Sequence, residues 1–334
     1  MKPVVSIIVP IYNTSRYLRE CLDSIISQSF ENWECILIND GSTDNSQSII
    51  DEYCTKDSRF IPVQKANEQS IDKARRYGIK YSTTEWLIMI DSDDAIEPHF
   101  IEKLISRQHS TKADLVTCCM IGCMKELEGI AYSVPEKDFD YNRVLTGYEA
   151  CLMTIGEWKI PGIGCIHRKT LWKNIPVGGI GNADEISSRY IILNASKVAF
   201  TDALYYYRSN DGTSAQVSFR MFNRAKVDKD IEDFGYNNYP DQIGALKKLT
   251  HNRLFNLIYL CADAQINNNA FTEDQNQQIK KLLSDTYCTL RRKQIIRYFP
   301  SHAWMTLLPY PLFKRLAYRY VTYKRSHGGK FFYR

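Results

Sequence analysis

The sequence contains no run of about 18 apolar residues, which is the length that a membrane-spanning helix needs. It also has no GxGxxG segment and no paired CxxC spacing. These absences exclude a helical membrane span, a dinucleotide-binding loop of the usual form and a zinc ribbon. Any contact with a membrane is therefore expected to be peripheral.

Acidic residues are absent from the last part of the chain, between Thr286 and Arg334. This tail carries eleven Lys or Arg and twelve aromatic residues, whereas the rest of the chain has 32 basic against 38 acidic side chains. Cations mixed with aromatic rings suit the headgroup region of an anionic membrane. We therefore expect contact with the inner face of the cell membrane. The alternative is a helical subdomain packed on the first domain; no motif supports nucleic-acid binding.

The ten cysteines are scattered, and no signal peptide precedes them. Cys35, Cys118 and Cys119 lie in apolar runs, where cysteine is a common small core residue. We therefore expect reduced thiols in a cytoplasmic protein. Because Cys118, Cys119 and Cys123 lack zinc-site spacing, core packing is favoured for them over metal binding.

Short apolar runs alternate with amphipathic segments in the first third of the chain, which predicts an α/β fold with a mostly parallel sheet. The first strand is expected over Val4–Val9 and is expected to end at Pro10. Thr14 or Ser15 is a candidate cap for the helix that follows, and Asp44 with Gln47 resembles a capping box. Further strands are expected over residues 35–38, 60–63, 86–90 and 113–120, and helices over residues 70–81 and after Pro98.

The second part of the chain has a weaker pattern. Residues 121–146 are polar and aperiodic, which predicts a long surface excursion. A helix is expected over residues 147–155, another near Asp184, and two strands over residues 197–201 and 204–207. Beyond residue 218 the pattern is helical. We expect an α/β domain over residues 1–215 and a mainly helical region over residues 216–334, with the basic tail over 286–334.

Polar residues follow three of the predicted strands at the point where each ends. Tyr12 and Asn13 follow the first strand, Asp40 follows the second, and the segment Asp91–Asp94 follows the fourth. The carboxyl ends of parallel strands share one edge of a sheet, where ligands bind. Clustered carboxylates repel one another unless a cation is present, and Mg²⁺ or Mn²⁺ takes such ligands together with substrate phosphates. The pattern indicates a cation-assisted phosphate site.

Residues 5–46, VSIIVPIYNTSRYLRECLDSIISQSFENWECILINDGSTDNS, closely resemble the opening of the family 2 glycosyltransferases with the GT-A fold. Residues 67–78, 87–98 and 175–214 match later parts of the same pattern more loosely. The resemblance implies a GT-A catalytic domain with a donor half over about 1–120 and an acceptor half over about 121–215. It also implies a glycosyltransferase of the hexosyl or N-acetylhexosaminyl type.

The resemblance implies roles for several residues in binding a nucleotide-sugar donor. Pro10 and Tyr12 would line the base pocket, and Asp40 would contact the uracil of a UDP-sugar. Arg75 matches the arginine of the family's ARN segment and would lie close to the phosphates. A cation and Arg75 would neutralise the charge that develops on the leaving diphosphate.

The same resemblance implies a metal site and a catalytic base. Asp91 would lie near the ribose and the Mn²⁺ or Mg²⁺, with Ser92 beside it in the nucleotide site, and Asp93 would ligate the metal. Asp184 would remove the proton of the acceptor hydroxyl in an inverting single displacement, with Glu185 as the second candidate. The acceptor is expected to be a glycan of a surface polysaccharide, carried on a lipid.

Four positions depart from the family pattern: Asn39 and Ala183 replace acidic residues, Gln69 replaces a glycine, and Arg76 replaces an asparagine. They leave a catalytically impaired nucleotide-sugar-binding protein as the alternative. A nucleotidyltransferase ranks last, because PIYNTSRY follows the first strand where a triphosphate-binding loop is needed. His167 lies in an apolar stretch, and both a structural role and an acceptor-binding role remain open.

Overall fold

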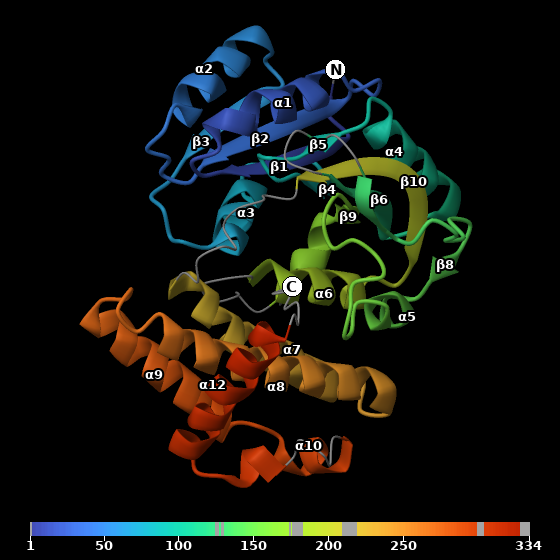
Figure 1. Cartoon of the computed structure of the whole chain (residues 1–334). Helices are drawn as coiled ribbons and strands as arrows, with labels where there is room; N and C mark the ends of the chain where they lie inside the picture. Colours follow the sequence, from blue (N-terminus) through green and yellow to red (C-terminus); the bar gives the residue numbers. More distant parts are fainter. Residues whose placement is uncertain are drawn as a thin grey trace. The chain divides into compact units, whose positions relative to one another are not determined.

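The computed structural model describes residues 2–123, 127, 130–173, 175, 183–208, 219–298 and 304–327. The chain forms two compact units, Met1–Asp211 and Gly212–Arg334. We call them the sheet unit and the helical unit, after the secondary structure that each contains (Figure 1). Within the described ranges, every helix is too short or too polar to cross a lipid bilayer.

The sheet unit has, among its described residues, ten strands in the order β3-β2-β1-β4-β9-β6-β10-β5, with β7 on β6 and β8 on β10. Strands β1 to β4 run parallel to one another, and β6 runs parallel to β10. Because β9 is antiparallel to both β4 and β6, all six parallel strands point the same way. The bounds are β1 Val5–Ile11, β2 Trp33–Asn39, β3 Phe60–Gln64, β4 Trp86–Met89, β5 Ala95–Ile96, β6 Leu115–Cys123, β7 Ile130–Val134, β8 Val144–Leu145, β9 Ile166–Arg168 and β10 Val198–Arg208.

Helices cover both faces of the first strands, with α1 and α2 on one face and α3 on the other (Figure 1). Every residue of β1 and β2 is buried, as expected for strands covered on both sides. The predicted α/β class is therefore confirmed. The bounds are α1 Ser15–Ile26, α2 Ser46–Lys56, α3 Ile71–Ile79, α4 Phe100–Thr111, α5 Gly147–Leu152, the 3₁₀ turn η1 Lys169–Trp172 and α6 Ala183–Asn194.

The expectation that Pro10 ends the first strand is wrong, because β1 continues through Pro10 to Ile11. The carbonyl of Ile8 accepts a hydrogen bond from the Ile90 N–H, next to the end of β4. Backbone groups two residues apart in a strand point to the same side, so the N–H that proline lacks at Pro10 would also face β4. Pairing with β4 ends at Ile8, and the proline therefore costs no ladder hydrogen bond.

The capping predictions hold only in part, because Asp44 binds the start of the second helix as expected but Thr14 does not cap the first. Thr14 and Asn45 occupy the N-cap positions of α1 and α2, but neither side chain makes a capping bond. Asp44 does this for both helices: Oδ2 accepts from the Ser15 N–H at 2.9 Å and Oδ1 from the Ser46 N–H at 3.0 Å. These bonds, outweighing the opposing effect of burial, lower the pKa of Asp44 to about 2.

Two further expectations are corrected along the second part of the sheet unit. The predicted surface excursion over residues 121–146 contains the end of β6 together with β7 and β8. The two short strands predicted over residues 197–207 form one strand, β10, with an irregular register between Phe200 and Leu204. Sequence periodicity breaks at such an irregularity, which explains why one strand resembled two.

The helical unit is built around α8, which packs against α7, α9, α10 and α12. Residues Phe313, Ala317 and Val321, spaced one turn apart, bury one face of α12 in this core. Part of the basic tail is thus packed within its own unit. The bounds are η2 Phe219–Asn223, α7 Arg224–Asn238, α8 Ile243–Ile266, α9 Glu273–Cys288, α10 Arg292–Tyr298, η3 Trp304–Leu307 and α12 Tyr310–Ser326.

Candidate active site

Hydrogen bonds join the loops that follow β1 and β2. The backbone N–H of Asn13 donates to Ser42 Oγ at 3.1 Å, and Asn13 Oδ1 accepts from the Thr43 N–H at 2.8 Å. Asn13 has a φ of 53°, in the left-handed region that asparagine tolerates better than most residues. The segments that carry Tyr12 and Asp40 are therefore held side by side.

The loop after β4 is joined to the same group of loops. Thr14 Oγ1 donates to Ser92 Oγ at 2.9 Å, and the Cys21 thiol lies 3.6 Å from the Asp91 carbonyl oxygen. The three predicted segments thus meet at the carboxyl edge of the parallel strands. Tyr12 is half exposed there, with 50% of its surface accessible, so that its ring is available for stacking.

Asp40 is buried and paired with a cation that the sequence analysis missed. Lys65 Nζ lies 2.6 Å from Asp40 Oδ1 and also donates to the Ala66 carbonyl at 2.8 Å. Both side chains are less than 10% exposed. Lys65 follows β3 directly, so the same rule on strand ends that singled out Asp40 points to this lysine too.

The replacement of acid by amide at Asn39 has a local explanation. Asn39 Oδ1 accepts from the Ser42 N–H at 2.8 Å, while its Nδ2 donates to Gln47 Oε1 at 2.6 Å. Gln47 turns its oxygen toward this position and its Nε2 toward Asp51, and in this orientation an amide at position 39 satisfies both partners whereas a carboxylate does not. Gln47 is therefore part of this loop support and not of the expected capping box.

Gln69 stands at a position where backbone conformation favours glycine. Its φ is 56°, and its N–H donates to Asn67 Oδ1 at 2.5 Å. A side chain in this left-handed conformation is strained by contact between Cβ and the carbonyl oxygen. The departure from the family's glycine at Gln69 thus costs free energy of folding without removing a chemical group.

The two neighbouring arginines of α3 point to different acids. Arg75 is buried, and its Nη2 lies 2.7 Å from Asp91 Oδ1. Arg76 instead pairs through Nε with the buried Asp72 at 2.8 Å, and its Nη2 donates to the Ile175 carbonyl at 3.2 Å. Only Arg75 of these two is therefore joined to the acidic segment after β4.

Tyr205 of β10 holds the acidic segment Asp91–Asp94 through its hydroxyl group. Its hydroxyl donates to Asp94 Oδ2 at 2.7 Å and accepts from the Asp91 N–H at 3.1 Å. The ring of Tyr205 is fully buried, as expected for part of the run Tyr205–Tyr207. Sequence reasoning assigned it to the core and missed this second role.

Arg208, at the end of β10, also binds the acidic segment. Its backbone N–H donates to Asp94 Oδ1 at 2.8 Å, and its Nε donates to the Asp93 carbonyl at 2.7 Å. The guanidinium also pairs with Glu20 at 2.5 Å and lies over the ring of Tyr17. Sequence reasoning missed Arg208 because the expected strand stopped one residue earlier.

Burial and mutual repulsion change the ionisation of this segment. Burial raises the pKa of Asp91, Arg75 opposes the rise, and the charge of Asp93 adds to it. Burial also raises the pKa of Asp94 well above its usual range, with Asp91 and Asp93 adding to the rise against the bonds from Arg208 and Tyr205. The carboxylates are thus close enough to influence one another.

A divalent cation would relieve this repulsion. Among the described residues, no three His, Cys, Asp or Glu side chains are arranged to hold a metal ion by themselves. Mg²⁺ and Mn²⁺ sites need only one or two carboxylates when substrate phosphates supply the other oxygens. The hard oxygen donors of Asp91 and Asp93 fit a cation shared with a diphosphate.

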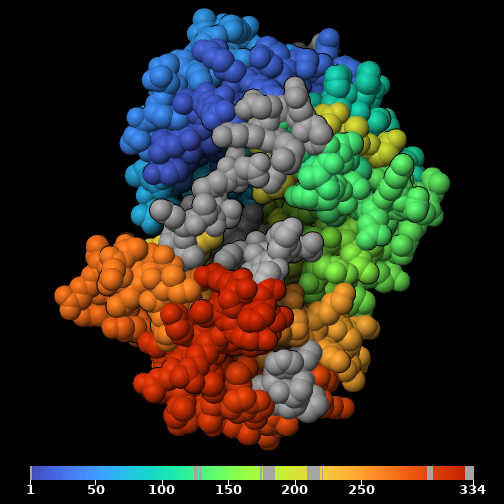
Figure 2. All heavy atoms as spheres, in the orientation of Figure 1, coloured from blue at the N-terminus to red at the C-terminus, as the bar shows by residue number. Residues whose placement is uncertain are grey.

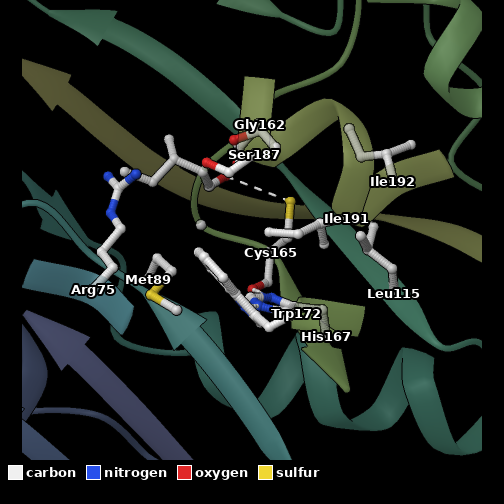
Figure 3. Close-up of a pocket in the computed structure, with 13 residues that line it drawn as sticks. Arg75, Met89, Leu115, Gly162, Cys165, His167, Trp172, Ser187, Ile191 and Ile192 are labelled. Atoms are coloured by element: carbon white, nitrogen blue, oxygen red, sulfur yellow. Dashed lines mark hydrogen bonds between the residues drawn. The ribbon is translucent and has the colours of Figure 1, made fainter. Parts of the chain in front are cut away.

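A small cavity of about 20 Å³ lies next to Arg75, with room for one water molecule. Arg75 and Met89 lie on one side of it, and Leu115 and Ile192 lie on the other (Figure 3). Ser187 of α6 also lines this cavity, so that α3 and α6 approach each other here.

His167 forms part of the same wall and is fully hydrogen-bonded. Its Nε2 accepts from the indole N–H of Trp172 at 2.8 Å, which leaves Nδ1 to donate to the Cys165 carbonyl at 3.2 Å. Burial, together with the charge of Arg75, lowers the pKa of His167 to about 4. The structural interpretation of this histidine is therefore favoured over acceptor binding.

The two candidate bases belong to the first turn of α6. Asp184 follows Ala183, the first residue of the helix, and the side chains of both lie outside the described residues. Glu185 pairs with the buried Arg189 at 3.1 Å. Arg189 in turn lies over the ring of Trp158 and donates to the Thr154 carbonyl at 2.9 Å. Glu185 thus already has a structural role.

Comparison with known proteins finds glycosyltransferases among both the family profiles and the curated relatives. The profile described as glycosyl transferase family 2 matches residues 6–158. Glycosyltransferase GlyG of Streptococcus pneumoniae serotype 4 (strain ATCC BAA-334 / TIGR4) is 31% identical over an alignment of 240 residues, and the match covers 66% of this chain and 76% of that protein. Glycosyltransferase GlyA of the same strain is 29% identical over 237 residues, but they are only 33% of its length.

Among solved structures, the chain is similar to S. aureus TarS 1-349, crystallised in complex with UDP-GlcNAc. The TM-score is 0.66 at 20% sequence identity, and the alignment covers 100% of this chain and 93% of that one. At this level of identity the similarity concerns the fold. It agrees with the GT-A architecture expected from the sequence.

Proposed function

The chain belongs to glycosyl transferase family 2, and from this premise we propose that it transfers a sugar from a UDP-sugar to a glycan acceptor with inversion at C1. The observation that carries the proposal is the meeting of three strand ends at one edge of the sheet. Direct hydrogen bonds between their loops hold Tyr12, Asp40 and Asp91–Asp94 in one region.

We propose that the uridine is bound by the loops after β1 and β2. Pro10 and Tyr12 would line the base pocket, with the exposed ring of Tyr12 stacking on the uracil. The carboxylate of Asp40, already oriented by Lys65, would accept from the uracil N–H. The UDP-GlcNAc named for the TarS complex supports a uridine donor and a hexosyl or N-acetylhexosaminyl group.

The diphosphate would lie against Arg75 and the acidic segment. Asp93 and Asp91 would hold Mn²⁺ or Mg²⁺, with Ser92 between them on the nucleotide side; the bound cation would neutralise charge on the leaving diphosphate. Arg75 lies 2.7 Å from Asp91 and would share its guanidinium between this carboxylate and a phosphate oxygen.

We propose Asp184 as the base that removes the proton of the acceptor hydroxyl. It precedes Ser187 by three residues in α6, and residues at this spacing share a helix face. Ser187 lines the cavity beside Arg75, which supports a place for Asp184 near the diphosphate region. The pairing of Glu185 with Arg189 makes Glu185 the weaker candidate.

The acceptor is proposed to be a lipid-linked glycan of a surface polysaccharide, reached at the cytoplasmic face of the membrane. The helical unit exposes Trp304 and Leu307, with accessible fractions of 52% and 64%. Aromatic and aliphatic side chains of this kind insert at membrane interfaces. Replacing both with serine should lower co-sedimentation with lipid vesicles, and unchanged binding would refute this contact.

The transfer itself is tested by the Asp93→Asn variant, with the exposed Asp202→Asn as the matched control. We expect Asp93→Asn to reduce UDP release from UDP-GlcNAc, in the presence of Mn²⁺ and glycan acceptors, by about 1,000-fold or more. Asp202→Asn should retain activity. Full activity of Asp93→Asn would refute the assigned site.

The alternative is a nucleotide-sugar-binding protein with impaired catalysis. It is favoured by Gln69, whose backbone is strained, and by Arg76, which is bound to Asp72. It predicts that UDP raises the melting temperature while no UDP-sugar is consumed with any acceptor. Turnover above that of the Asp93→Asn variant excludes this alternative.

A further inference from the structure

The helical unit contains a hollow that the proposed transfer does not use. Its volume is about 700 Å³, which is within the range of small-molecule binding sites. Three helices supply its walls, and the side chains of α9 and α12 both reach the surface of the unit (Figure 2). The lining residues are Gln265 from α8, Lys280, Lys281 and Ser284 from α9, and Tyr310, Pro311, Lys314 and Arg315 from α12.

Four of the eight lining residues are cations, and none is acidic. Lys280 and Lys281 come from one helix, while Lys314 and Arg315 come from another that is distant in sequence. Folding therefore concentrates positive charge in one concavity, where the four charges repel one another. A run of lysines along a single helix would not explain this convergence.

Some cations of the helical unit have acidic partners. Arg325 lies 2.8 Å from Asp263, and Arg291 lies 2.8 Å from Asp233. By contrast, among the described residues no carboxylate lies within 4.0 Å of the four cations that line the hollow. Within the part of the unit that the structure describes, no ion pair thus neutralises the charge in the hollow.

Neutral hydrogen-bonding groups complete the lining. Ser284 offers a hydroxyl, and Gln265 is held by a bond of its Nε2 to the Lys314 carbonyl at 3.4 Å. Tyr310 and Pro311 form the first turn of α12, whose N-cap residue Pro309 makes no side-chain capping bond. The positive end of the helix dipole therefore adds to the potential in the hollow.

From these features we propose that the hollow binds a phosphate group of an anionic ligand. A phosphate offers up to two negative charges and three acceptor oxygens, which match several lysines and the fork of Arg315. A lipid headgroup and a soluble phosphate compound share this chemistry, and the two arms of the test distinguish these sources. The site lies outside the proposed donor site, so the two proposals fail independently.

The test compares the wild-type chain with Lys281→Glu/Lys314→Glu and with the control Lys293→Glu/Lys324→Glu, which makes the same charge change outside the hollow. One arm measures co-sedimentation with phosphatidylglycerol vesicles and with phosphatidylcholine vesicles. The other arm measures binding of inorganic pyrophosphate by calorimetry. Any pyrophosphate bound at the donor site contributes equally to all three proteins.

We expect the Lys281→Glu/Lys314→Glu variant to bind at least tenfold more weakly than both other proteins in one arm, and that arm identifies the source of the phosphate. Added salt should weaken wild-type binding, since the lining is exposed to solvent. Equal binding by all three proteins, or an equal loss in both variants, would overturn the proposal. The milder Lys281→Gln/Lys314→Gln variant removes the same two charges without reversing them. Melting curves of both variants show whether a loss of binding is accompanied by a loss of folding.

Discussion

The hydroxyl of Tyr205 donates a hydrogen bond of 2.7 Å to Asp94 and accepts one of 3.1 Å from the backbone of Asp91. One buried side chain from β10 therefore holds both ends of the acidic segment that follows β4. Arg208, three residues further along β10, holds the middle of the segment through the Asp93 carbonyl. The segment is thus positioned by a strand more than a hundred residues away in sequence.

Replacing Tyr205 with phenylalanine should impair transfer while preserving the fold. The change leaves the Asp94 carboxyl and the Asp91 N–H without this partner, at a cost of about 1–3 kcal/mol in unfolding free energy. We expect kcat to fall more than the donor affinity, because the segment is present but less well positioned. Urea unfolding and steady-state kinetics measure the two effects; Tyr207→Phe, on a more exposed tyrosine, is the control. Identical kinetics for Tyr205→Phe would show that the link is structural only.

The Gln69→Gly variant should be more stable than the wild-type chain. Gln69 has a φ of 56°, and glycine adopts this conformation without the Cβ contact, which we expect to contribute about 1 kcal/mol. The control is Lys80→Gly, at a φ of −64°, where glycine should destabilise by a similar amount. A lower melting temperature for Gln69→Gly would contradict the prediction.

His167 should make the sheet unit sensitive to mild acid. Its pKa is about 4 in the folded chain against 6.5 for an ordinary histidine, so the unfolded chain binds the proton first as pH falls. Stability should therefore decrease as pH is lowered from about 6.5 to about 4, by on the order of 3 kcal/mol in total. Chemical unfolding across this range should show a flatter profile for His167→Gln than for the wild type. The same flattening in the exposed His109→Gln would assign the effect to another cause.

The first half of the sheet was predictable because its signal is local. The strands β1 to β4 are short apolar runs, and the loops after them carry the polar residues that the rule on strand ends selects. Both patterns are read within a few neighbouring residues. The prediction failed at Pro10 because the number of paired neighbours at a given residue depends on the sheet order, which the sequence does not display.

The supporting residues were missed although Lys65 and Arg208 both stand at strand ends. Their roles depend on partners in loops that follow other strands, Asp40 and the acidic segment, and this pairing is not visible in the local sequence. Composition around Arg208 shows only the end of an aromatic strand. Asp44 was assigned to a local capping box, although its carboxylate also reaches the start of α1.

Asp44→Ala should destabilise the sheet unit by about 1–3 kcal/mol, because it removes the N-terminal bonds of two helices at once. Asn45→Ala is the matched control, since Asn45 holds the N-cap position of α2 without a capping bond. Thermal unfolding of the two variants measures the difference. Equal melting temperatures would show that the bonds to Ser15 and Ser46 contribute little.

The Asp44 carboxylate binds the first residues of two helices, α1 and α2. The length of the connection between β2 and α2 is therefore constrained by the position of α1 as well. Adding or deleting a residue there would shift Asp44 away from Ser15 and disturb α1, although α1 precedes it in the chain. Attempts to change donor preference by grafting this loop from a relative should therefore keep its length and its aspartate, and vary only the side chains around them.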